Sequence, residues 1–173
     1  MKKKKSYHWL LFIIIAIILI GTALYHILPP YIDRLWTARS YKKLAEEYVS
    51  DESEPDDGKQ KKKDWWLTDV KVEFDKLKAE NQDVIGWIRF DNQDEFGINY
   101  PILHSGDNEK YLRTDLHGNN HIAGSIFLEG LNKSDFSDYY NIIYGHNMID
   151  GSMFGSLKKY KDEGFWQENQ YFT

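Results

Sequence analysis

A long stretch without a single charged side chain constrains this chain more than any other feature. Asp, Glu, Lys and Arg are absent from Ser6 to Ile32, and within that window Trp9 to Leu28 is almost wholly apolar. A helix needs about 20 such residues to cross the hydrocarbon layer of a membrane. We therefore expect residues 9–28 to form a transmembrane helix.

The residues on either side of this helix predict its orientation. Residues 1–8 form a basic tail containing Lys2 to Lys5, and such clusters stay in the cytoplasm. The chain beyond Asp33 would then lie outside the cell. A cleaved signal peptide is the alternative, but its apolar core is usually shorter and ends at a small-residue site. The sequence from Tyr25 to Pro30 is a poor cleavage site, which favours an uncleaved, single-pass anchor.

Composition limits the chemistry of the rest of the chain. The formal net charge of the 173 residues is −5, and without the four lysines at 2–5 the chain has 18 basic and 27 acidic residues. A nucleic-acid partner requires a basic face, so we expect none. The sequence contains no cysteine, which excludes disulfides, thiolate metal sites and thiol nucleophiles within these residues.

Residues 29–68 are expected to connect the anchor to the domain. Helical spacing predicts a juxtamembrane helix over Tyr31–Val49. The polar stretch Ser50–Lys63 has too few apolar side chains to offset the entropy of ordering, so it is interpreted as a flexible linker. Its lysine cluster could form a lipid or nucleic-acid patch, but the acidic residues just before it favour a solvated linker.

Residues 69–173 are predicted to form a mostly β domain. A helix starting after Asp64, or after Thr68, should run to about Asn81. Short strands separated by turns then favour a β-barrel or sandwich with helices at its N-terminal side. Because Pro101 cannot donate a backbone hydrogen bond, its strand is expected at an edge of the sheet or at a bulge. The expected strands are Val84–Phe90, Ile98–Leu103, Gly124–Leu128, Asn141–Tyr144 and the start of one at Gln170–Thr173. A turn is expected at Asp91–Gly97, a short helical turn at Glu109–Leu116 and a short amphipathic helix at Met153–Tyr160.

Of the six histidines, His146 has the most informative surroundings. It follows the apolar run Asn141-Ile142-Ile143 and Tyr144-Gly145, so its imidazole should lie at the end of a strand, although a strand-end histidine can also be purely structural. His117 and His121 have a metal-ligand spacing. Because Gly118-Asn119-Asn120 separates them, a loop without a metal ion is the favoured interpretation. His8 and His26 flank the apolar helix and His104 ends a strand.

Six segments in this order resemble the class B sortases, the membrane-anchored cysteine transpeptidases of Gram-positive cell envelopes. The resemblance extends from about Asp69 to the end, and the anchor and N-terminal helices fit the same layout. The segments are Asn81–Ile88, Ile98–Leu103, Ser105–Leu112, Ala123–Leu128, Asn141–Met148 and Gly151–Phe154.

The resemblance implies an eight-stranded β-barrel that cleaves a sorting motif (Asn-Pro-x-Thr-Asn or Ser/Pro-Pro-x-Thr-Gly) after its Thr. The acyl group passes through a thioester to an amine of the peptidoglycan cross-bridge. His146 matches the family's catalytic histidine, an acid towards the leaving amine and a base towards the incoming one. Asn108, Leu112 and Tyr144 match positions lining the sorting-motif groove. No cofactor is implied, and the partners are the secreted protein, the cross-bridge amine and the membrane.

The sequence departs from the family in one respect. The cysteine strand (Thr-x-x-Thr-Cys) and the later arginine strand lie downstream of a segment like the one ending at Thr173, and Arg89 and Arg113 lie in the wrong segments to substitute. We therefore expect an incomplete, C-terminally truncated sortase that is inactive alone. The alternative is a non-catalytic anchored protein that binds peptides on a sortase-like scaffold.

Overall fold

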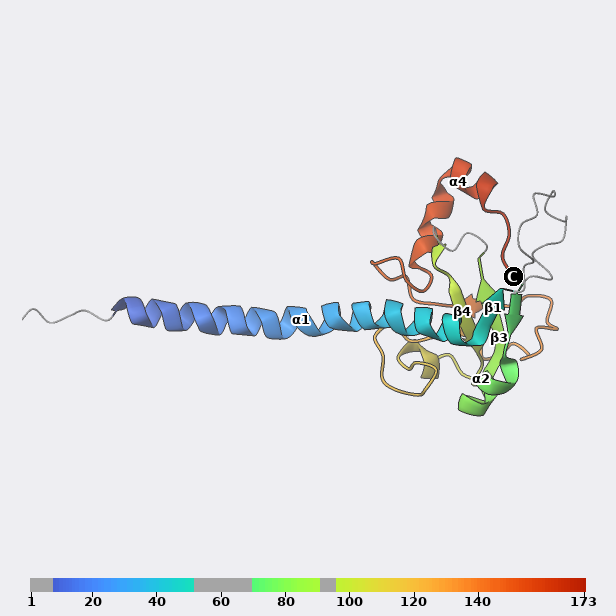
Figure 1. Cartoon of the computed structure of the whole chain (residues 1–173), viewed down its shortest axis with the longest axis horizontal. Helices are drawn as coiled ribbons and strands as arrows, with labels where there is room; N and C mark the ends of the chain where they lie inside the picture. The colour runs from blue at the N-terminus through green and yellow to red at the C-terminus, as the bar shows by residue number, and fades with distance from the viewer. Residues whose placement is uncertain (1–7, 52–69, 91–95) are drawn as a thin grey trace, which may run out of the picture.

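Helix α1, His8–Tyr48, dominates the shape of the chain: its first half extends away from the domain formed by the rest (Figure 1). The computed structural model describes residues 8–51, 70–90 and 96–173. The predicted anchor and juxtamembrane helix form one continuous helix through Pro29 and Pro30. By length and composition, Trp9–Pro29 could cross a membrane, in agreement with the expected anchor over residues 9–28.

The last two turns of α1 pack onto the domain. Tyr41, Leu44, Ala45 and Tyr48 are buried, and their spacing puts them on one face of the helix. The Tyr41 hydroxyl donates to the carbonyl oxygen of Gly124 at 2.8 Å. The helix that contains the apolar span is thus also part of the domain core.

A two-stranded sheet follows α1 and corrects one prediction. β1 (Val49–Asp51) pairs antiparallel with β2 (Val70–Val72), so the expected helix to Asn81 begins only at α2, Phe74–Glu80. Val70 and Val72 are β-branched and favour a strand. Both proposed helix starts, Asp64 and Thr68, lie outside the described residues, as do linker residues 52–63 and residues 91–95 of the expected turn.

The main sheet has four strands in the order β3-β4-β5-β6. β3–β4 and β5–β6 are antiparallel pairs and β4–β5 is parallel. The sheet confirms the predicted strands with shorter bounds. These are β3 Val84–Arg89, β4 Asn99–Leu103, β5 Ile126–Leu128 and β6 Ile143–Tyr144, and a short 3-10 turn, η2 (Lys110–Leu112), connects β4 to β5.

Pro101 does not place its strand at an edge, which was one of the two predicted alternatives; the other was a bulge. It lies in β4, opposite Trp87 of β3, and β5 pairs with β4 from Ile102 onward. Pro101, which has no N–H, therefore lies just before the part of β4 that pairs with a strand on each side. Within that part, a proline would remove a hydrogen bond between strands. A register shift does occur nearby, in β3 between Val84 and Gly86.

Alternate residues of the central strands contribute to two apolar clusters. Ile102 and Ile126 belong to one cluster, and Leu103 and Phe127 to the other. Because successive side chains of a strand point to opposite faces, the sheet is packed on both sides. The second cluster also contains Tyr111 of η2, which is 1% exposed, and this contact fixes η2 against the sheet.

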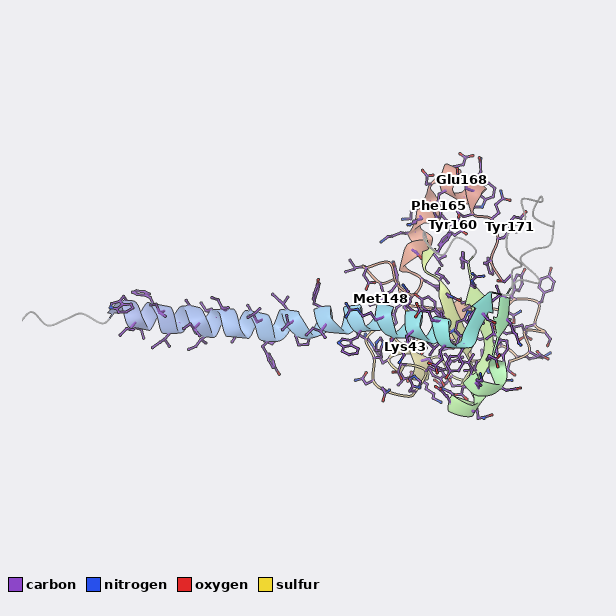
Figure 2. All side chains as sticks on the ribbon, in the orientation of Figure 1. Lys43, Met148, Tyr160, Phe165, Glu168 and Tyr171 are labelled. Atoms are coloured by element: carbon purple, nitrogen blue, oxygen red, sulfur yellow. The ribbon has the colours of Figure 1, made fainter. Side chains whose placement is uncertain are left out.

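The C-terminal segment returns to β3 after two short helices, η3 (Gly155–Lys161) and α4 (Glu163–Glu168). Tyr160 and Phe165 lie close together there (Figure 2), with ring centroids 5.7 Å apart. The strand predicted at the end of the chain is a bridge between Phe172 and Phe90. Arg89 and Thr173 exchange backbone hydrogen bonds of 2.7 and 2.8 Å, and this pairing places the C-terminus beside β3 (Figure 1).

Candidate functional site

His146 lies just beyond the end of β6, as its sequence context predicted. Gly145 makes this position possible, because a Cβ there would collide with the Ile126 side chain and the Phe154 ring. The backbone oxygen of His146 accepts from the Phe154 N–H at 3.0 Å. Asn147 also bridges Met153, so the loop that follows the histidine is closed at its base.

The His146 imidazole makes one specific contact with a distant part of the chain. Its Nε2 donates to the carbonyl oxygen of Leu112 at 2.8 Å. Since a carbonyl only accepts, Nε2 carries the hydrogen, and the neutral ring presents Nδ1 as its basic nitrogen. The side chain is half-buried, so His146 is both oriented and accessible for proton transfer.

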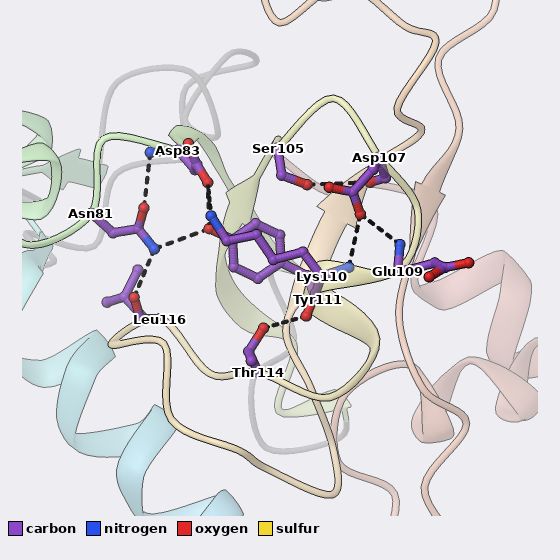
Figure 3. A network of polar contacts seen from close by, with 9 residues as sticks. All are labelled: Asn81, Asp83, Ser105, Asp107, Glu109, Lys110, Tyr111, Thr114 and Leu116. Carbon is purple, nitrogen blue, oxygen red and sulfur yellow. Dashed lines mark hydrogen bonds and ion pairs between the residues drawn. The ribbon is translucent and has the colours of Figure 1, made fainter.

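The turn that supplies Leu112 is held by a polar network (Figure 3). Asp107 Oδ1 accepts from the backbone N–H groups of Glu109 and Lys110, each at 2.8 Å. Asp83 Oδ2 accepts from Lys110 Nζ at 2.6 Å and from the Tyr111 hydroxyl at 2.7 Å. These bonds fix the residues immediately before Leu112, and thereby the carbonyl that orients the imidazole.

The electrostatics of this network favour an ionised Asp83. Partial burial opposes ionisation, but the hydrogen bonds from Lys110 and Tyr111 outweigh it and hold the carboxyl pKa below its usual value. Burial, followed by the bond to Asp83, raises the pKa of the Tyr111 hydroxyl. The network therefore carries a fixed negative charge balanced by Lys110.

The predicted groove residues Asn108 and Tyr144 meet at a residue that the sequence did not single out. Asn108 Nδ2 donates to Glu129 Oε1 at 2.5 Å, and the Tyr144 hydroxyl donates to Glu129 Oε2 at 2.6 Å. The amide oxygen of Asn108 accepts from the Gly130 N–H at 2.7 Å. One carboxylate, at the end of β5, thus joins the loop before η2 to β6.

Asn108 and Tyr144 both influence the ionisation of Glu129. The hydrogen bonds from Tyr144 and then Asn108 hold its carboxyl pKa below the usual value. The same bond to Glu129 raises the pKa of the Tyr144 hydroxyl. Glu129 is therefore anionic near neutral pH. Tyr144 and Leu112 remain 38% and 40% exposed, so their side chains are available to a ligand.

Three other histidines and the arginines Arg89 and Arg113 make different contacts. His117 Nδ1 is 3.2 Å from Glu80 Oε2, and His121 lies edge-on to Tyr41 at 6.4 Å between ring centroids. His104 donates its backbone N–H to the backbone carbonyl oxygen of Asp83 at 2.8 Å. Arg113 donates to the Ile122 carbonyl at 3.2 Å, and Arg89 ends β3. Among the described residues, no group of three or more His, Asp or Glu side chains could hold a metal ion.

Comparison with known proteins gives one consistent answer. The chain is 43% identical to sortase B of Listeria monocytogenes over 105 residues, covering 61% of this chain and 42% of the relative. It is 27% identical to sortase B of Staphylococcus aureus over 158 residues, covering 91% and 58%. The chain thus spans about half the length of these curated relatives. Profiles of known protein families give no match.

Solved structures extend the similarity to the fold. Sortase B from Bacillus anthracis, in complex with AAEK1, matches with a TM-score of 0.65 and 32% identity, covering 82% of this chain and 61% of the other. A Streptococcus pyogenes class B sortase involved in pilus biogenesis matches at 0.54 and 35%, covering 58% and 54%. The fold is that of a sortase, as predicted. These relatives and neighbours support a class B sortase, so the predicted resemblance is confirmed.

Proposed function

We propose that this chain carries the histidine and groove portion of a class B sortase, a membrane-anchored cysteine transpeptidase. The whole enzyme would cleave a sorting motif of the Asn-Pro-x-Thr-Asn or Ser/Pro-Pro-x-Thr-Gly type after its Thr. It would then attach the secreted protein to a peptidoglycan cross-bridge amine. The observation that supports this most directly is the hydrogen bond from His146 to Leu112 beside the Asn108–Glu129–Tyr144 group.

The proposed chemistry divides one difficult substitution into two easier ones. A cysteine thiolate attacks the Thr carbonyl carbon, the C–N bond breaks, and imidazolium His146 gives its Nδ1 proton to the leaving amine. The acceptor amine then attacks the thioester, neutral His146 takes a proton from that amine, and the thiolate is released. The hydrogen bond to Leu112 holds Nε2, so Nδ1 is the nitrogen that exchanges the proton.

The thiolate has to be supplied from outside these 173 residues, which contain no cysteine. We therefore propose that the 173-residue chain alone is inactive. Asn108, Leu112 and Tyr144 would contact the sorting motif. Trp9–Pro29 would span the cell membrane with the lysines at 2–5 in the cytoplasm, so that the domain faces the cell wall.

A chimera tests the proposal. The chain is continued after Thr173 into the corresponding C-terminal part of the Listeria sortase B and assayed with a fluorogenic Asn-Pro-x-Thr-Asn peptide. We expect cleavage after Thr by the chimera and none by the 173-residue chain. His146→Ala should lower chimera activity by about 100-fold or more, whereas the matched control His117→Ala should retain it.

Two results would count against the proposal. Unchanged cleavage in the His146→Ala chimera would remove the assigned role of the histidine. A folded chimera that binds the peptide without cleaving it would favour the alternative, a non-catalytic peptide-binding protein on a sortase-like scaffold.

A further inference from the structure

Two groove residues share one carboxylate, and the directions of their hydrogen bonds are determined by the chemistry of the groups. Glu129 as an anion only accepts, so Asn108 and Tyr144 must both donate to it. The Gly130 N–H only donates, so the oxygen of Asn108 must face Gly130. The orientation of the Asn108 amide is therefore fixed at both of its ends.

These directions decide what the two side chains can offer a ligand. Tyr144 has committed its hydroxyl hydrogen to Glu129, so its oxygen can only accept from a ligand. Asn108 uses one of its two amide hydrogens on Glu129 and keeps the other as a donor. The Tyr144 oxygen is thus an acceptor and the Asn108 amide a donor, each held by one oxygen of the Glu129 carboxylate. Such a pair is complementary to the N–H and C=O of an amide.

We propose that Glu129 is the positioning residue of the groove, and that it sets the hydrogen-bonding polarity of Asn108 and Tyr144 so that together they recognise an amide group of an extended peptide. This inference rests on the proposed function, because the ligand is the sorting-motif peptide. Glu129 itself acts through its two neighbours.

Replacement of Glu129 by Gln makes a sharp test because it hardly changes shape. Gly130 prevents Asn108 from turning round, so the amide oxygen of Gln would face Asn108 and its NH2 group would face Tyr144. Tyr144 must then accept from Gln and turn its own hydrogen towards the ligand. The Tyr144 hydroxyl would then offer the ligand a donor in place of an acceptor. A ligand N–H facing it, which is also a donor, would be left unpaired.

The first measurement is peptide affinity. The full chain in detergent micelles is titrated with acetyl-Asn-Pro-Ala-Thr-Asn-amide by calorimetry. We expect Glu129→Gln and Tyr144→Phe each to weaken binding on the order of tenfold, since each leaves a ligand N–H unpaired. Glu129→Asp keeps the charge but cannot reach both partners, so it should also bind more weakly. The control Glu109→Gln removes an exposed charge next to Asn108 and should bind like the original chain.

A double-mutant cycle separates positioning from simple charge. In a Tyr144→Phe background, Glu129→Gln should have little further effect, because the residue it acts through is gone. Equal weakening in both backgrounds, or full affinity of Glu129→Asp or Glu129→Gln, would overturn the inference. Thermal unfolding of each variant confirms that it is folded.

A second measurement needs no ligand and keeps the two proposals distinguishable. The Tyr144 hydroxyl is titrated by NMR with a ¹³Cζ label, and the Glu129→Gln variant should lose the upward pKa shift that Glu129 causes. An unchanged Tyr144 titration would overturn the positioning role. If the original chain does not bind the peptide, the proposed contacts of Asn108 and Tyr144 with the sorting motif are not supported, the chimera still tests the proposed function, and this titration alone decides the role of Glu129.

Discussion

The Nε2 of His146 lies 2.8 Å from the carbonyl oxygen of Leu112, a residue 34 positions earlier in the chain. This contact joins the end of β6 to the turn η2, and the network around Asp83 holds that turn in place. The orientation of the imidazole thus depends on residues that are remote from it in sequence.

The His146 tautomer gives a direct prediction. When the ring is neutral, the hydrogen bond to Leu112 should keep the proton on Nε2 and leave Nδ1 unprotonated. ¹⁵N chemical shifts of the imidazole at alkaline pH check this. His117, whose Nδ1 faces a carboxylate, serves as the comparison and should favour a proton on Nδ1. A His146 ring protonated at Nδ1 would contradict the observed orientation.

Gly145→Ala should destabilise the domain and displace His146. The added methyl would collide with the Ile126 side chain and the Phe154 ring, and overpacking of this kind costs about 1–3 kcal/mol. Thermal unfolding and the His146 NMR signals measure the two effects. Gly21→Ala is the control, because its Cβ would have no neighbour within 4 Å. Equal unfolding temperatures for both variants would count against the packing argument.

Asp83→Asn should make stability less dependent on pH in the acid range. The pKa of Asp83 is lower in the folded chain than its ordinary value, so its ionised form stabilises the fold above about pH 4, and this contribution is lost as pH falls through the folded pKa. Replacement at neutral pH should cost roughly 1–2 kcal/mol through weakened bonds to Lys110 and Tyr111.

Urea unfolding at several pH values tests this expectation. The difference between the original chain and Asp83→Asn should be largest near neutral pH and shrink below about pH 4. Glu109→Gln, at an exposed position in the same network, should show a much smaller difference. A gap that stays constant across the acid range would mean that the charge of Asp83 is not the stabilising group.

Tyr41→Phe should loosen the attachment of α1 to the domain. The buried hydroxyl donates to the Gly124 carbonyl, and burial raises its pKa well above the ordinary value. Its loss leaves that carbonyl without this donor, at a cost of about 1–2 kcal/mol. Hydrogen exchange over residues 41–48 should accelerate, whereas Tyr31→Phe, at an exposed position, should leave exchange unchanged.

The sequence predicted features that depend on local pattern. The strand before His146 and the long apolar helix follow from runs of neighbouring residues, and both elements are present. Glu129 was missed because its partners, Asn108 and Tyr144, are 21 and 15 residues away. The only local signal was its place after the apolar strand Ile126–Leu128.

Two secondary-structure predictions were wrong for reasons that cannot be recognised from neighbouring residues alone. Val70 and Phe74 have helical spacing, but Val70–Val72 pairs with Val49–Asp51, a strand far away in sequence. Two separate helices were predicted, over residues 9–28 and Tyr31–Val49, whereas α1 is continuous through Pro29 and Pro30. In both cases the outcome depends on contacts or continuity that are absent from any short window of residues.

Because α1 is continuous, it determines how far the domain of the proposed enzyme lies from the membrane. With Trp9–Pro29 in a bilayer, the helix rises from Pro29 to its docking residue Tyr41 by about 18 Å. The membrane-spanning residues and the residues that pack on the domain belong to the same helix. Any tilt of the span in the lipid would therefore move the domain as well. Sorting motifs would therefore have to reach the groove in a narrow layer close to the membrane surface.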